Sequence, residues 1–456
     1  MERDNASSVR STYTMFAIVT VACALGSLTQ TVMNSMLLGI QDSFGTTENV
    51  SQWLTTIYML TIGITVPIVT HLSRKLSIRT LTLLSLGFFL LGSLIDLVAP
   101  NFAILLIGRI PQAIATGITL PLLNTIAMVR FPKGQNGTAM GIAGIAMGFA
   151  PNIGPLIGGA LVDTLGWRSF YIILSAVLAV MVVLSFVILV REKAPAHDAR
   201  LDFVSFLEST IGFGGLLLGF TNAATLGITD VQVLVELVIG VVFIVLFVQR
   251  QKRLEYPLIS MKIFKTPDYV ISFTAQNCLF ASFMGITLII PLFVQNVCGL
   301  SALDAGIVFI PATILAVIFN PLAGILSDKI GPRPVVVVAS IFLSVGSASM
   351  IFVDASTPLW LLTLMQTIRG IGVSSLIGPL ISWGMAKLSF DVMMDGSAFL
   401  ATARQACASF GTALMMLVIA MVSTSVGDGA FAYQLAFALS AVFSVAVLVL
   451  AIMRVK

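Results

Sequence analysis

A short charged turn at residues 324–333 stands between two long apolar runs of the chain. Its sequence, GILSDKIGPR, places Asp328 beside basic residues and between two turn-forming glycines, in a chain of which only 10% of residues are charged. The same frame occurs earlier at residues 70–79, where THLSRKLSIR has Arg74 at the position of Asp328 and lacks both glycines. A turn repeated in each half of a largely apolar chain is typical of transporters built from two related halves.

The apolar run at residues 137–162 is rich in proline and glycine. In its segment APNIGPLIGG, at residues 150–159, Pro155 removes a helix hydrogen bond and bends the helix axis. Gly154 and Gly158 are four residues apart, so they share a face on which another backbone can approach closely. Tight packing alone would explain such glycines, but two prolines and several glycines in one run favour a helix that takes part in gating.

Arg109 lies well inside the apolar run of residues 102–129. An ionisable group at membrane depth is costly and is usually functional, although an arginine that caps carbonyls of neighbouring helices is the structural alternative. Asp96, Glu208 and Glu236 are the acidic candidates for carrying a proton, because a buried carboxyl group can exchange a proton near neutral pH. These three acids are therefore the predicted proton carriers.

Polar and adaptable apolar side chains at mid-span positions are candidates for binding a substrate, because transporter sites lie near the bilayer midplane. The set is Gln30, Asn34, Tyr58, Gln112, Gln276, Asn277, Phe280 and Arg404. For each residue alone, a hydrogen bond or contact between packed helices is the alternative role. Together they suit a small amphipathic organic compound, since no paired basic clamp for a phosphate or dicarboxylate is present.

The composition places the chain in a membrane. Of 456 residues, 58% are hydrophobic, and the mean hydropathy of +1.05 is far above that of a soluble globule. A helix needs about 20 apolar residues to cross the hydrocarbon core, and only helices satisfy their backbone groups locally there. The apolar runs predict an all-α integral membrane protein with fourteen transmembrane helices.

The charged residues in the loops set the expected orientation. Lys and Arg concentrate in the loops on the side of both termini, whereas Arg168 alone falls on the opposite side, so both termini are expected in the cytoplasm. The net charge of +4 is then a signal of topology and not of nucleic-acid binding. The four cysteines are scattered, and no metal, cofactor or catalytic motif is evident, so neither an enzyme nor an ATP-driven pump is expected.

Polar segments divide the chain into two helical bundles and an extra helix pair. The expected parts are a cytoplasmic N-terminus (1–12), an N-terminal six-helix bundle (13–190), a linker (191–202), an extra helix pair (203–250), a second linker (251–268) and a C-terminal six-helix bundle (269–453). The halves echo each other beyond the turn, since NGTA at 136–139 corresponds to DGSA at 395–398.

These motifs resemble those of the major facilitator superfamily, in its fourteen-span branch of drug:proton antiporters. The turn is similar to that family's G-x-L-S/A-D-R/K-x-G-R/K-R/K, and residues 150–159 are similar to its antiporter motif G-x-x-x-G-P-x-x-G-G, with Ala150 in place of the first glycine. The resemblance implies the major-facilitator fold and export. It also implies conformational roles for Gly324, Asp328, Gly331, Arg333, Gly154, Pro155, Gly158 and Gly159. Arg109, with Gln112 three residues later, matches a family motif linked to proton transfer, so the resemblance implies that Arg109 takes part in proton coupling.

One departure from the family concerns the first span. The family pattern L-D-x-T-I-V-N aligns with residues 28–34, where Thr29 occupies the place of the acid, so the usual proton site is absent. Without that carboxylate, neutral or anionic amphiphiles should be favoured over dications. Asp328→Asn should depress transport, and Arg74→Ala should have a milder effect.

The resemblance therefore implies a multidrug efflux antiporter of a bacterial inner membrane. It would be monomeric, would bind no nucleic acid, and would exchange amphipathic drugs, dyes or toxic metabolites for protons by alternating access. An exporter of a specific lipid or metabolite and a proton-coupled uptake system are the alternatives.

Overall fold

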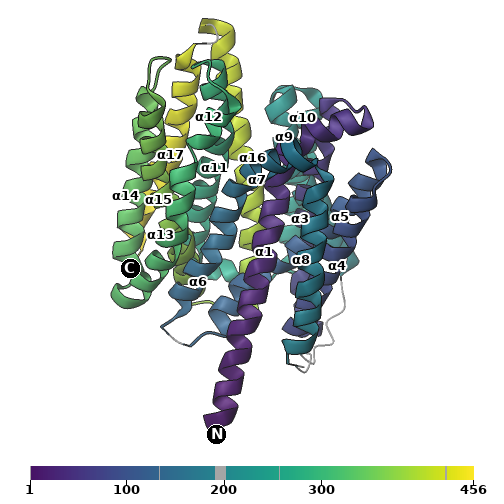
Figure 1. The fold of residues 1–456 in the computed structure, drawn as a ribbon. Helices are drawn as coiled ribbons and strands as arrows, with labels where there is room; N and C mark the ends of the chain where they lie inside the picture. The colour runs from purple at the N-terminus through teal and green to yellow at the C-terminus, as the bar shows by residue number, and fades with distance from the viewer. Residues whose placement is uncertain (1, 133, 191–201, 256, 427–428, 456) are drawn as a thin grey trace.

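The computed structural model describes all residues except 1, 133, 191–201, 256, 427, 428 and 456. Every regular element in this described part is helical (Figure 1), which confirms the all-α class. The first bundle consists of α1 (Glu2–Phe44), α2 (Glu48–Ser51), α3 (Trp53–Lys75), α4 (Ile78–Val98), α5 (Phe102–Val129), α6 (Asn136–Gly144), the π-helical turn η1 (Ile145–Phe149), α7 (Ala150–Leu165) and α8 (Arg168–Ile188).

The remaining helices form the extra pair and the second bundle. The extra pair is α9 (Phe203–Leu226) and α10 (Val231–Gln251). The second bundle consists of the 3₁₀ turn η2 (Met261–Lys265), α11 (Pro267–Asn296), α12 (Ala302–Ile307), α13 (Ile310–Ile330), α14 (Pro332–Ser349), the 3₁₀ turn η3 (Met350–Phe352), α15 (Leu359–Met385), α16 (Phe390–Val426) and α17 (Ala430–Arg454).

Fourteen helical stretches in the described chain are long and apolar enough to cross a membrane, as the sequence predicts. One of them joins α6, η1 and α7 into a single span. The predicted N-terminal segment 1–12 is already helical from Glu2 onward. The predicted linker 191–202 lies outside the described residues except for Asp202, which caps α9 through its side chain.

The extra helix pair lies against the seam between the two bundles. Helix α9 packs on α3 of the first bundle and on α16 of the second, whereas α10 packs mainly on α9. Most of the large apolar side chains of α10, such as Leu234, Val238 and Val242, are exposed in the protein alone. Such a surface suits contact with lipid tails.

The two bundles meet mainly near the end of the molecule at which both termini lie, here called the termini end (Figure 1). At this end α6 and η1 pack on α13 and α15, and α3 and α5 pack on α16. Helix α7 continues the span of α6 toward the opposite end, where it packs on α1 and α8 of its own bundle. The seam between the bundles is therefore closed at the termini end.

Candidate functional site

Asp328 joins the two bundles at the termini end. Its carboxylate accepts hydrogen bonds from the backbone N–H groups of Gly137 (2.8 Å) and Thr138 (2.7 Å) and from the Thr138 hydroxyl (2.6 Å). Gln135, at the N-cap position of α6, supplies no side-chain cap, so Asp328 satisfies these N–H groups from the other bundle. The turn connects the tenth and eleventh spans, and its acid contacts the beginning of the fifth span, in the opposite bundle.

Glycines bring the backbones of α13 and α6 together beside Asp328. A Cβ atom on Gly324 would lie 3.1 Å from Cα of Gly141 and would collide with the carbonyl group of Gly137. Gly331 ends α13 with a φ of +88°, which a residue with a side chain rarely adopts. Arg333 is exposed on the following turn.

A second contact joins the bundles at the equivalent place in the first half. Arg74 donates two hydrogen bonds to the carboxylate of Asp395, at 2.8 and 3.1 Å, and a third to the carbonyl group of Pro257 at 2.7 Å. The Asp395 side chain is 1% exposed and also accepts a bond of 2.8 Å from the backbone N–H of Ser260. The segment between the extra helix pair and the second bundle is thus tied to this ion pair.

The two contacts form a charge-inverted pair of latches. In the first latch the acid stands on the turn, as Asp328, and the start of the facing helix is neutral. In the second latch the turn carries Arg74, and the acid stands on the facing helix as Asp395. The first-half turn thus has Arg74 in place of the expected acid, and the acid that pairs with it, Asp395, lies on the other side of the seam.

A cavity of about 620 Å³ lies beside the second latch. Its lining includes Arg74, Lys252, Lys262, Lys265, Glu255 and Asp391, and none of the predicted substrate residues. The cavity is at the termini end and not at mid-span.

The glycines of the fifth span face two different partners. Cβ atoms on Gly154 and Gly158 would lie within about 3 Å of backbone atoms of Val32 in α1, so these glycines allow a close approach within the first bundle. Gly141 instead lies against α13 of the second bundle. The π-helical turn η1 separates the two sets, and such turns rotate the helix face that follows them.

Two other gating candidates of that span contribute differently. Gly159 has open space where a Cβ atom would lie, so close packing does not require glycine there. Pro155 lies within α7, past the π-helical turn.

Arg109 is fully buried inside the first bundle. Its guanidinium group donates to the carbonyl groups of Leu54 and Thr29 and to the side chain of Gln112, at 3.2, 3.3 and 3.0 Å. It also lies over the ring of Tyr58, with Cζ 4.2 Å from the ring centroid. Arg109 therefore binds carbonyl groups of its neighbours, as the structural alternative requires, but one of its nitrogens, Nη2, is sealed from solvent without a partner.

Asp96 lies next to this arginine. It is 0% exposed, and its carboxylate contacts the position of Gly108, where a Cβ atom would collide with it. The carboxylate faces Arg109, Tyr171 and Gln112, yet neither oxygen has a hydrogen bond of good geometry, and the Tyr171 hydroxyl lacks one as well. Among the acids whose burial the structure describes, only Asp96 and Asp395 are buried, and Asp395 is paired.

The other two acidic candidates lie in the extra helix pair. Glu236 accepts hydrogen bonds from Asn222 (2.9 Å) and from Gln232 (3.0 Å). Glu208 is half-buried near the ion pair of Asp202 and Arg250. That ion pair lowers the pKa of Asp202 well below its ordinary value. The structure thus brings Arg109 and Asp96 together and places Glu208 and Glu236 elsewhere.

The polar substrate candidates of the first bundle differ in how firmly they are held. The Tyr58 hydroxyl donates to the carbonyl group of Gly26 (2.9 Å) and also bonds to Thr116 (2.6 Å), inside the bundle. Gln112 is likewise buried, between Arg109 and Ser93. By contrast, Gln30 is half-buried and Asn34 is exposed, with one hydrogen bond of 3.3 Å from Thr55.

The candidates of the second bundle lie closer to the seam. Gln276 donates to the carbonyl group of Ile377 (2.9 Å) and Asn277 to that of Phe273 (2.8 Å), so the side-chain oxygens of both amides are left unpaired. Arg404 lies over the ring of Phe280, with Cζ 4.3 Å from the ring centroid.

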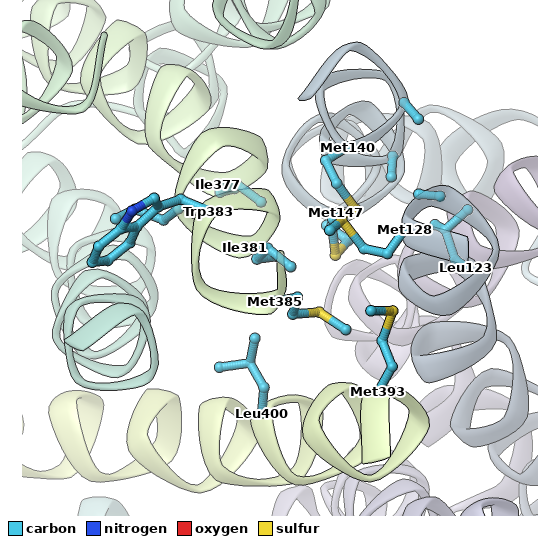
Figure 2. Packing of buried hydrophobic residues seen from close by; sticks show 14 of the residues in the cluster. Leu123, Met128, Met140, Met147, Ile377, Ile381, Trp383, Met385, Met393 and Leu400 are labelled. Atoms are coloured by element: carbon cyan, nitrogen blue, oxygen red, sulfur yellow. The ribbon is translucent and has the colours of Figure 1, made fainter. Parts of the chain in front are cut away.

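A methionine-rich apolar cluster closes the seam between these residues and the termini end. Figure 2 shows Met128, Met140 and Met147 of the first bundle near Met385 and Met393 of the second. Methionine side chains are unbranched and polarisable, so they can repack around different shapes. The sequence does not reveal this cluster, because its members lie far apart along the chain.

The buried acid of the second latch was also missed as a functional residue. Its one sequence signal was the correspondence of DGSA at 395–398 with NGTA at 136–139. Because Asn136 begins α6, which Asp328 caps, the matching position in the other half was the place to look for a partner of Arg74.

Known proteins resemble the chain along most of its length. Residues 16–411 match the family model of the Major Facilitator Superfamily. The chain is 32% identical to the uncharacterized MFS-type transporter YcnB of Bacillus subtilis, over 92% of this chain and 89% of that protein. It is 31% identical to the lincomycin resistance protein LmrB of Listeria monocytogenes, over 87% of this chain and 84% of that protein.

A solved structure shares the fold. The transporter FucP, in a crystal structure of its outward conformation, covers 98% of this chain and all of its own, with a TM-score of 0.65 and 14% identity.

Proposed function

The chain belongs to the major facilitator superfamily, and on that premise we propose that it exports amphipathic organic compounds in exchange for protons. The membership makes it a multi-pass membrane transporter with bacterial relatives. The proposal adds the substrate class, the direction, the coupling ion and a bacterial inner membrane, with the termini end facing the cytoplasm.

Export is supported by the relatives and by the fifth span. LmrB is named for lincomycin resistance, which export of that compound from the cell would produce, and the chain is 31% identical to it. In this chain the glycines of the fifth span face the second bundle on one side of a π-helical turn and α1 on the other. The span therefore links the seam to the interior of the first bundle, as a gating helix requires.

The observation that supports proton coupling is the buried carboxylate of Asp96, which lies beside Arg109 without a well-formed hydrogen bond. The acid expected at Thr29 is absent, yet the backbone carbonyl group of Thr29 still accepts a bond from Arg109 (3.3 Å). Asp96 approaches the same arginine from α4 and is buried, and neither of its oxygens has a hydrogen bond of good geometry. A buried carboxyl group that can be neutral or paired with an arginine is suited to binding and releasing a proton.

The two latches indicate how the transporter would open and close during export. With the termini end in the cytoplasm, the Asp328 and Arg74 latches and the methionine cluster close the cytoplasmic side. Both latches must break for the substrate to enter from the cytoplasm. An uptake transporter would use the same elements in the reverse order, so the direction of transport rests on the drug-resistance relative.

The test measures the export of a fluorescent amphiphile from cells into the medium. The same compound is then used to measure accumulation in everted membrane vesicles. Wild-type protein should accumulate the compound in vesicles that hold a proton gradient, and an uncoupler should abolish accumulation. Asp96→Asn should express and bind the compound but should not accumulate it. Uncoupler-resistant accumulation, or full activity of Asp96→Asn, would refute coupling through this acid. Glu236→Gln is the matched control and should keep full activity.

A further inference from the structure

We propose that Arg404 is the anchor for an anionic group on the substrate, so that the central site selects amphiphiles with a carboxylate, sulfonate or phosphate beside an apolar body. This inference rests on the proposed export function and narrows its substrate class. The evidence is the unusual environment of this arginine among the buried arginines of the described chain.

In the part of the chain that the structure describes, three arginines are buried, and two of them are held by oxygen atoms. Arg109 bonds to two carbonyl groups and an amide oxygen. Arg369 donates to the carbonyl group and the hydroxyl of Ser282, at 2.9 and 3.2 Å. Both lie inside their own bundles and are 0% exposed. These arginines have acceptors that fix them within the fold.

Arg404 has no oxygen acceptor among the described residues. Its one hydrogen bond runs from Nη1 to the sulfur of Met147, at 3.4 Å, and its guanidinium plane faces the ring of Phe280. Arg404 forms no ion pair with an acid in the described part of the chain, and the thiol of Cys23 is close enough to interact with its charge. A guanidinium group has five N–H donors, and thioether and ring partners satisfy them poorly.

The position of Arg404 matches that of a substrate site. Arg404, Met147, Phe280 and Cys23 all lie near the middle of their spans, which come from both bundles. Arg404 keeps 6% exposure, whereas unpaired nitrogens of Arg109 and Arg369 are sealed. The arginine is thus at the seam, near the bilayer midplane, where a transported compound must pass.

The surroundings define the chemistry of the occupant. A desolvated cation without an acceptor is expensive at membrane depth, and a ligand oxyanion would supply the missing acceptors in a two-bond geometry. Phe280, Phe283 and Met147 provide apolar contact for the rest of the molecule. A dication would instead meet a like charge, and no described carboxylate pairs with Arg404 to offset it.

A matched pair of fluorescent probes tests the inference. 1-Anilinonaphthalene-8-sulfonate and N-phenyl-1-naphthylamine share one ring skeleton and differ in the sulfonate. Their binding is titrated with the purified full chain in nanodiscs, for wild type, Arg404→Gln, Arg404→Lys and Lys265→Gln. The last variant removes one cation from the cavity beside Arg74 and controls for sulfonate binding there.

Wild type should bind the sulfonate probe roughly tenfold to a hundredfold more tightly than the neutral probe, the range expected for a charge-assisted contact. Arg404→Gln should lose that preference while keeping its affinity for the neutral probe, which shows that the variant is folded. Arg404→Lys should keep part of the preference, and Lys265→Gln all of it.

The outcomes separate this inference from the export function. A preference that survives in Arg404→Gln, an equal loss for both probes, or no sulfonate binding by wild type would overturn the anion anchor. If the sulfonate binds through Arg404 but a proton gradient does not move it in vesicles, the anchor stands and the export function fails.

Discussion

The Arg74 latch gives the sharpest quantitative prediction about conformation. Arg74→Ala leaves the buried carboxylate of Asp395 with the backbone N–H of Ser260 as its remaining bond in the structure. Removing one partner of a buried ion pair costs about 3–5 kcal/mol. Because the Arg74 side chain is 20% exposed, about 3 kcal/mol is the appropriate figure. Since 1.4 kcal/mol is a factor of ten, the population open at the termini end should rise roughly a hundredfold.

The assay is the labelling rate of a cysteine placed in the closed seam. Ser397 is 0% exposed and donates across the seam to the carbonyl group of Pro121 at 3.0 Å. In a background without the native cysteines, Ser397→Cys should react with a maleimide only when the seam opens, so the rate reports the open population. Arg74→Ala should speed the reaction roughly a hundredfold.

Two further variants make the prediction specific to the ion pair. Arg74→Ala with Asp395→Ala removes both charges, so its labelling rate should return to within about tenfold of the background. Arg250→Ala breaks the pair with Asp202, which lies in the extra helix pair and links no bundles, and should leave the rate unchanged. The low pKa of Asp202 keeps that control pair ionised at the assay pH. Background labelling in Arg74→Ala, or equally fast labelling in the double variant, would refute the reasoning.

Two other predictions concern the acids of the coupling and latch systems. Asp328→Asn should weaken the cap on α6 by about 1.5–3 kcal/mol, which raises the Ser397→Cys labelling rate and depresses transport without loss of expression; unchanged labelling and transport would contradict it. Thr29→Asp, added to Asp96→Asn, should restore proton-driven transport, because the backbone of residue 29 already bonds to Arg109 and a carboxylate at this residue would be near the guanidinium group; vesicles of the double variant that remain inactive although the protein is folded would count against it.

The fold could be predicted from the sequence because a bilayer imposes simple rules. The length of the apolar runs needed to cross the water-free hydrocarbon core defines fourteen spans. The Lys and Arg residues of the loops give an expected orientation. The repeated turn carries one residue of each latch, Asp328 and Arg74, but the contacts of these residues across the seam became evident only in the structure. The spans, the loop charges and the repeated turn are each encoded in a short stretch of sequence, so they can be recognised without the structure.

The roles of the buried charges depended on the assembled structure. From the sequence, Arg74 replaces the expected acid, and Arg74→Ala is expected to have a milder effect than Asp328→Asn. Because Arg74 pairs with the buried carboxylate of Asp395 in the structure, we predict a large effect instead. Asp96 was one of three similar acidic candidates until packing showed it unpaired beside Arg109. Such roles arise from contacts between spans far apart in the chain, which composition and spacing do not specify.

The most direct test of the central claim is the number of protons that the purified transporter releases when a transported compound binds. Because coupling between two ligands is reciprocal, a proton and a substrate that compete must displace each other. Wild-type protein in weak buffer near neutral pH should release roughly one proton per transporter on saturation, and Asp96→Asn should release none while still binding the compound. Equal proton release by wild type and Asp96→Asn, or none by either, would contradict proton-coupled export through Asp96.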